Sequence, residues 1–153
     1  MANEIITKRD AVSTFTITLA ALANAAARQS TMITNTNDRP AMITQWKIQS
    51  GGTAPTAGAV YELFLLRGNG SGYRTDNAGA ADAAITIENA QLLGTIVVTA
   101  TTNKNFFGDF DTAPLGPLDE EFGIAVRNSS GQALNGTEGN HTKQFELYLP
   151  EVQ

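Results

Sequence analysis

The sequence predicts an all-β protein, a single-domain β-sandwich or jelly roll of about eight strands with an extended N-terminal arm. Apolar and polar residues alternate with a period of two in several segments, as in strands that bury one face. Stretches rich in Gly, Pro and Asn separate these segments, which is typical of turns. Only 16% of the residues are charged. Thr, Asn, Ala, Ser and Gly take their place, and these favour strands and tight turns over long exposed helices.

The chain begins with a segment that lacks a firm strand pattern. Residues 1–12 are expected to form the extended arm, and residues 13–153 the sandwich domain, because no repeat or linker divides them. The first predicted strand is STFTITL (13–19), whose Phe, Ile and Leu share one face. The Ala-rich stretch 19–27 is the one plausible helix, of one or two turns at most.

The remaining strands repeat the pattern of short alternating segments between turns. Six further strands are expected over AMITQWKIQ (41–49), EFGIAVRN (121–128), KQFELYLP (143–150) and, with a weaker pattern, RQSTMI (28–33), TIVVTATT (95–102) and NFFGDF (105–110).

One strand candidate, AVYELFLLRG (59–68), is apolar on both faces. Tyr61, Leu63 and Leu65 form one face, while Phe64 and Leu66 lie on the other. Such a strand is usually central in its sheet or covered by another part of the protein. The alternative is that its second face forms a subunit interface.

Composition and charge exclude several partner classes. The formal net charge is −5, and the six Arg and four Lys are spread along the chain, so a basic face for nucleic acid is not expected. No stretch is apolar enough to span a membrane, and the first residues lack the apolar core of a signal peptide. There is no Cys, which excludes disulfides and thiolate metal sites.

The candidate catalytic and metal-binding residues form no recognised motif. The single His, His141, lies in a polar loop without a Gly-x-Ser-x-Gly motif. Asp109 and Asp111 share a strand face, and carboxylates at 119–121 follow, but neither group matches a calcium loop. The Gly-rich segment 68–72 precedes no phosphate-binding helix. We therefore expect no enzyme activity, no cofactor and no metal.

Four Asn-x-Ser/Thr triplets begin at Asn69, Asn128, Asn135 and Asn140. Their number is only slightly above what this composition produces by chance. Because N-glycosylation also requires a secretory route, we expect these triplets to carry no glycan.

Four segments together resemble a group of tailed-bacteriophage head proteins, the small all-β capsid decoration (cementing) proteins. They are FTITLAALANAAARQSTMITN (15–35), WKIQSGGTAPTAGAVYELFLLRGNG (46–70), LLGTIVV (92–98) and FGIAVRNSSGQALNGTEGNH (122–141). The resemblance covers most of the chain from about residue 13.

The resemblance implies a non-enzymatic structural virion protein on the outer surface of a phage capsid. Proteins of this group form homotrimers that bind and stabilise the lattice of the major capsid protein. A chain without Cys or a signal peptide suits synthesis in the host bacterial cytoplasm.

Two groups of residues are candidates for contacts with the capsid or a sister subunit. One is the arm segment with Asn3, Glu4, Ile5 and Ile6, which could add a strand to the edge of a neighbouring sheet. The other is the second apolar face of the 60–66 strand, with Phe64 and Leu66.

Two alternative functions compete with capsid decoration. One is a carbohydrate-binding jelly roll, for which Trp46, Tyr73 and Asp76 are the best candidate residues. The other is a different virion surface protein, at the head–tail junction or on the tail.

Overall fold

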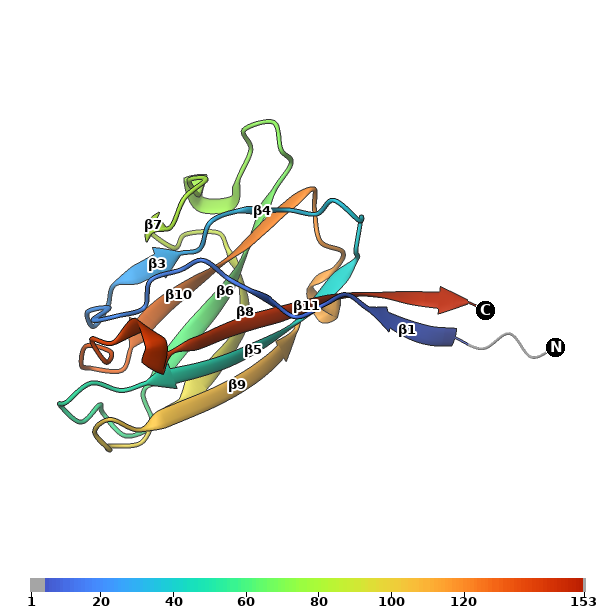
Figure 1. Ribbon diagram of the computed structural model, residues 1–153. Helices are drawn as coiled ribbons and strands as arrows, with labels where there is room; N and C mark the ends of the chain where they lie inside the picture. Colours follow the sequence, from blue (N-terminus) through green and yellow to red (C-terminus); the bar gives the residue numbers. More distant parts are fainter. Residues whose placement is uncertain (1–4, 153) are drawn as a thin grey trace.

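The computed structural model describes residues 5–152 and confirms the all-β prediction: two antiparallel sheets face each other as a β-sandwich (Figure 1). The first sheet has the order β1-β11-β5-β9, with β2 also paired to β11. Its strands are β1 (Ile5–Arg9), β2 (Ser13–Thr14), β5 (Ala41–Gln49), β9 (Asn105–Asp111) and β11 (Thr142–Val152).

The second sheet has the order β7-β3-β10-β6-β8, with β4 also paired to β10. Its strands are β3 (Ala27–Gln29), β4 (Ile33–Thr34), β6 (Val60–Gly68), β7 (Ala83–Ala84), β8 (Gln91–Val97) and β10 (Glu121–Ser129). Three single 3₁₀ turns complete the fold: η1 (Thr75–Asn77), η2 (Ala113–Leu115) and η3 (Glu138–Asn140). Within residues 5–152 there is no helix long and apolar enough to cross a membrane.

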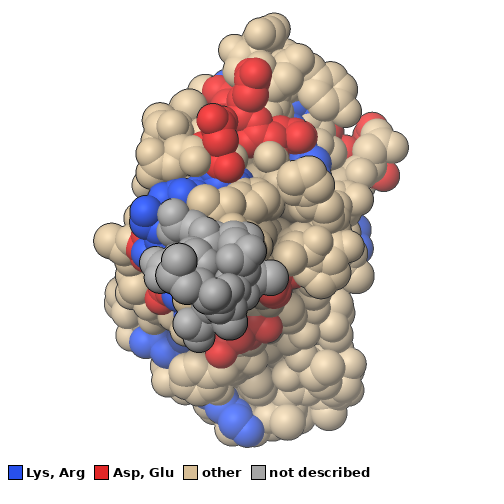
Figure 2. Space-filling view, turned by 90° about the vertical axis from the view of Figure 1, so that its right-hand side faces the viewer, with Lys and Arg blue, Asp and Glu red and all other residues tan. Residues whose placement is uncertain are grey.

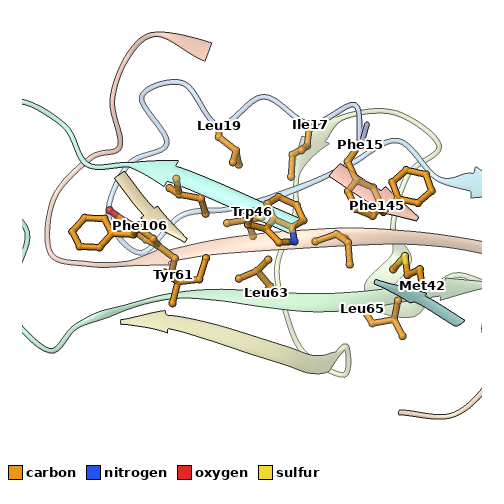
Figure 3. Close-up of a cluster of buried hydrophobic side chains, with 14 of the residues drawn as sticks. Phe15, Ile17, Leu19, Met42, Trp46, Tyr61, Leu63, Leu65, Phe106 and Phe145 are labelled. Carbon is orange, nitrogen blue, oxygen red and sulfur yellow. The ribbon is translucent and has the colours of Figure 1, made fainter. Parts of the chain in front are cut away.

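The hydrophobic core lies between the two sheets and follows the predicted alternation. Trp46 of β5 packs beside Phe15, with ring centroids 5.6 Å apart, and Phe145 of β11 lies 4.4 Å from Phe15 (Figure 3). From the facing sheet, Tyr61 and Leu63 of β6 point into the same layer. The inward residues of each strand are buried because burial of apolar surface is the main favourable term in folding.

The segment predicted as the first strand is extended, but only Ser13 and Thr14 join a sheet ladder. Phe15, Ile17 and Leu19 are buried as the alternation predicts. Their backbone groups have other partners. The Glu138 carboxylate accepts the N–H groups of Leu19 and Ala20 at 2.8 and 2.7 Å. The Glu138 carboxylate thus takes the place of a neighbouring strand and satisfies these two backbone donors.

The short helix expected over 19–27 is not formed. Ala21 and Ala25 have φ values of 55° and 63°, which a right-handed α-helix excludes. Their N–H groups donate to the distant carbonyls of Asn135 and Asn128, at 3.0 and 2.7 Å, and not to carbonyls one turn earlier. Tertiary hydrogen bonds therefore override the helix propensity of Ala at this site.

The segment predicted at 95–102 is also shifted: β8 begins at Gln91 and ends at Val97. Val98 remains buried and its N–H donates to the carbonyl of Ala59. The residues that follow turn toward β9 and form no ladder.

The two-faced strand 60–66 is central in its sheet, between β10 and β8. Its second face is covered by the chain itself. Phe64 and Leu66 form a second apolar cluster with Ala78 and Ala125, and Ile85 and Ile87 pack over it from the segment that links β6 to β8. Of the two interpretations of this strand, the structure supports a central strand covered by the chain itself. Phe64 and Leu66 are buried within the subunit and offer no surface to a neighbouring subunit.

Candidate functional site

The most distinctive feature of the molecule is a two-stranded ribbon that extends beyond the sandwich (Figure 1). It consists of β1 and the last residues of β11, paired from Ile5–Val152 to Arg9–Tyr148. The neighbouring strand β5 stops at Ala41, opposite Tyr148. Beyond Tyr148, the ribbon therefore has no third strand among the described residues.

The outer edge of β1 is open. Asp10 donates its N–H to the carbonyl of Leu147 at 2.8 Å, which shows which backbone groups face β11. In an antiparallel ladder this direction alternates, so the N–H and C=O of Thr7 and Arg9 point away from β11. An open edge of this kind can accept another extended chain by strand addition.

The opposite edge of the ribbon, along β11, is poor in hydrogen-bond donors. Pro150 lies opposite Thr7. By the same alternation it faces away from β1, where its missing N–H costs the ladder nothing. Proline at an open edge opposes uncontrolled strand pairing. The ribbon thus offers one pairing edge, along β1.

Two ion pairs fix the ribbon to the body. Asp10 accepts two hydrogen bonds from Arg39, at 2.8 and 3.0 Å, and these bonds hold the pKa of the Asp10 carboxyl below its usual value. In the second pair, Arg9 of β1 lies 3.3 Å from Glu146, in the part of β11 that belongs to the sandwich. The base of the ribbon is therefore held by side chains as well as by the ladder.

In the view along the ribbon, acidic side chains gather toward one end of this face, and basic side chains also lie near the ribbon (Figure 2). Asp38, Asp119 and Glu120 line one hollow at this end of the sandwich, between the loop before β5 and the loop before β10. A partner with basic residues would complement this end electrostatically.

The residues predicted for this contact are only partly at this end. Asn3 and Glu4 lie outside the described residues. Ile5 and Ile6 belong to β1, and Ile6 is half-buried. Phe64 and Leu66 are buried elsewhere, beneath the segment between β6 and β8. The open edge at Thr7 and Arg9 was not singled out in the sequence, because strand edges depend on pairing between distant segments.

The three residues proposed for a carbohydrate site do not come together. Trp46 is a core residue, 2% exposed. The Asp76 carboxylate is occupied by the N–H groups of Asn89 and Ala90. Only Tyr73, 66% exposed, is accessible.

Residues 5–152 contain no group of three His, Asp or Glu side chains placed to hold a metal. Asp111 accepts a hydrogen bond from the hydroxyl of Tyr148 at 2.8 Å, and burial together with this carboxylate raises the pKa of Tyr148 to about 12. Glu121 is paired with Arg74 at 2.8 Å. These carboxylates therefore serve structural contacts.

His141 is buried and connects β5 to the loop before β11 by two hydrogen bonds. Its Nδ1 accepts the N–H of Gln49 at 3.3 Å, so Nε2 carries the proton and donates to the carbonyl of Asn135 at 3.1 Å. Burial lowers the pKa of His141 below its usual value, while Glu138 opposes this shift and Lys143 and Lys47 support it. The neutral ring is the form that fits, because a proton on Nδ1 would face another N–H group.

This geometry predicts that the protein loses stability as the pH falls below about 6.5. The unfolded chain then binds a proton that the folded state takes up only at lower pH, so the free energy of unfolding decreases with falling pH. Urea denaturation between pH 7.5 and pH 5 measures the effect. Because the chain has one His, the variant His141→Gln should show a much smaller decrease over this range. An equal slope in both proteins would contradict the prediction.

Comparison with known proteins adds no assignment: no family model and no curated protein matches this chain.

Proposed function

We propose that this chain is a structural virion protein that binds the outside of a phage head as a homotrimer and stabilises the lattice of the major capsid protein. The resemblance of residues 15–141 to capsid decoration proteins suggests the class. The observation that carries the proposal is the β1–β11 ribbon, which extends from a compact sandwich and leaves the edge of β1 open.

Strand addition to β1 supplies the mode of contact. An extended segment of the major capsid protein would pair with the outward N–H and C=O groups of Thr7 and Arg9, and the side chains of β1 would set the register. A single five-residue edge gives a weak contact. Three copies in a trimer would act together through their high effective concentration, which makes the assembly firm without a large interface per copy.

Deletion of residues 2–11 provides the first test. The sandwich should remain folded, because the core begins at Phe15, while the number of copies bound to purified heads that lack this protein should fall by at least about tenfold. Circular dichroism and sedimentation check the fold and the trimer. Undiminished occupancy of the heads would exclude the ribbon from the contact.

A pair of point variants tests the open edge more sharply. Thr7→Pro removes one outward N–H group, which faces away from β11, and should weaken head binding. Thr7→Val keeps this N–H and a similar side-chain shape, so it should bind as the parent protein does. Equal binding by both variants would argue against strand addition at β1.

Another virion location, at the head–tail junction or on the tail, remains the competing assignment. Labelling of the protein on intact particles separates the two. Label spread over the head surface supports decoration, and label at one vertex or along the tail overturns it.

A further inference from the structure

A hollow of about 420 Å³ lies beside the end of β6. It is bordered by the loop after β6, the start of β8 and the loop before β10, and its volume falls within the range of small-ligand sites.

Tyr73 forms one wall and is presented by a braced loop. It is 66% exposed. The side-chain oxygen of Asn69 accepts the N–H groups of Ser71 and Tyr73, at 3.0 and 3.2 Å, and the N–H of Asn69 donates to the carbonyl of Tyr73. The ring face is thus accessible to a ligand, and the loop that carries it is held in shape by its own hydrogen bonds.

Two side-chain amides on the neighbouring segment are available to a ligand. The Oε1 atom of Gln91 accepts a hydrogen bond from Arg67 at 3.1 Å, so its NH₂ group is left to donate elsewhere. The backbone N–H of Asn89 is held by Asp76 at 2.6 Å. The side-chain amide of Asn89 has no hydrogen-bond partner among the described residues. Both amides line the hollow.

Arg67 forms the floor but does not make the hollow an anion site. Its guanidinium donates to the carbonyls of Leu115, Gly116 and Pro117 and to Gln91. The carboxylate of Asp119 lies 3.9 Å away, and its side chain is half exposed. With four hydrogen bonds to protein acceptors and a carboxylate beside it, Arg67 is a poor partner for a phosphate.

These features exclude most ligand classes. An anion would meet Asp119 without a free cation. A metal ion would find a single carboxylate, already close to Arg67. An apolar ligand would leave the two amides unpaired, which costs free energy. What remains is a neutral ligand with hydroxyl groups on its edges and a C–H face for the aromatic ring.

We infer that this hollow is a binding site for a neutral saccharide. The C–H face of a sugar ring packs on Tyr73, whose rigid ring provides a large contact area. Hydroxyl groups of the sugar accept from the amides of Asn89 and Gln91 and donate to the carboxylate of Asp119. The site is distinct from the open β1 edge, because none of these residues belongs to the ribbon, although Asp119 also lines the acidic hollow beside the ribbon.

A titration of the ¹⁵N-labelled protein with named sugars tests the inference. The probes are the methyl glycosides of glucose, galactose, mannose, N-acetylglucosamine and rhamnose, each up to about 20 mM, a range suited to a shallow single-sugar site. At least one should shift the amide signals of Tyr73, Asn89 and Gln91 and leave the ribbon signals unchanged. Inorganic phosphate at the same concentration should shift none of them.

Three variants test whether the aromatic ring of Tyr73 makes the contact with the sugar. Tyr73→Ala should weaken binding of the responsive sugar at least about tenfold, and Tyr73→Phe, which keeps the ring face, by no more than about threefold. Phe107→Ala removes an aromatic ring that is equally exposed on the opposite sheet, and should leave binding unchanged. The inference is overturned if no sugar shifts these signals, if phosphate alone does so, or if Tyr73→Ala binds as the parent protein does.

Discussion

Replacement of Trp46 by alanine is expected to lower the free energy of unfolding by about 3–5 kcal/mol. Trp46 is 2% exposed and lies at the centre of the layer between the sheets, where it packs against Phe15 (Figure 3). Alanine would leave a cavity that the two sheets cannot close, because the hydrogen-bonded ladders keep each sheet rigid. Urea denaturation followed by circular dichroism measures the change.

A matched control lies on the neighbouring strand. Phe107 of β9 is 70% exposed on the outer face of the first sheet, and Phe107→Ala should change the free energy of unfolding by less than about 0.5 kcal/mol. The variant Trp46→Phe should lie between the two. It loses volume but also removes an indole N–H that is buried without a hydrogen-bond partner. A loss below about 1 kcal/mol for Trp46→Ala would mean that the core can repack around the gap.

The strands that alternation predicts well are those with long ladders. The predicted segment 41–49 coincides with β5, and 121–128 and 143–150 agree with β10 and β11 within a few residues. In these strands the pattern in the sequence and the burial in the structure have one cause, since each strand has one face in the core.

The Ala-rich segment shows where local pattern fails. Its conformation is set by partners more than a hundred residues away, such as Glu138 for the N–H groups of Leu19 and Ala20. No local signal identifies these partners. The carboxylate of Glu138 could have been recognised only as one acidic residue of a polar loop.

The candidate surfaces depend on tertiary structure in the same way. The arm was predicted as an extended segment that could add a strand to a neighbouring sheet, and β1 pairs with the other end of its own chain, Ile5 with Val152. The apolar face with Phe64 was predicted either to be covered or to form an interface, and the pattern of one strand cannot identify its cover. The hollow beside Tyr73 joins the segment between β6 and β8 with the loop before β10, which is distant in the sequence.

Asn128 is the second residue whose replacement should have a large effect. It begins one of the four Asn-x-Ser/Thr triplets, but its side chain is buried, with 0% exposure. Its Nδ2 donates to the carbonyls of Leu22 and Gln132 at 2.8 and 2.7 Å. Its Oδ1 accepts from the N–H and the hydroxyl of Ser130 at 3.1 and 2.7 Å. The nitrogen that a glycan would occupy is thus fully engaged in holding two loops together.

Asn128→Ala should therefore lower the free energy of unfolding by about 3 kcal/mol, because four hydrogen bonds are lost and buried carbonyls of Leu22 and Gln132 lose a donor. Asn89→Ala is the matched control: the same side chain is removed from an exposed site with no side-chain hydrogen bond, and the change should stay within about 0.5 kcal/mol. Hydrogen exchange locates the effect. Faster exchange should appear at the N–H groups of Ala25 and Leu134, which donate to Asn128 and Leu22. If Asn128→Ala is as stable as Asn89→Ala, the amide does not hold the loops, and the backbone bonds between these segments are sufficient to do so.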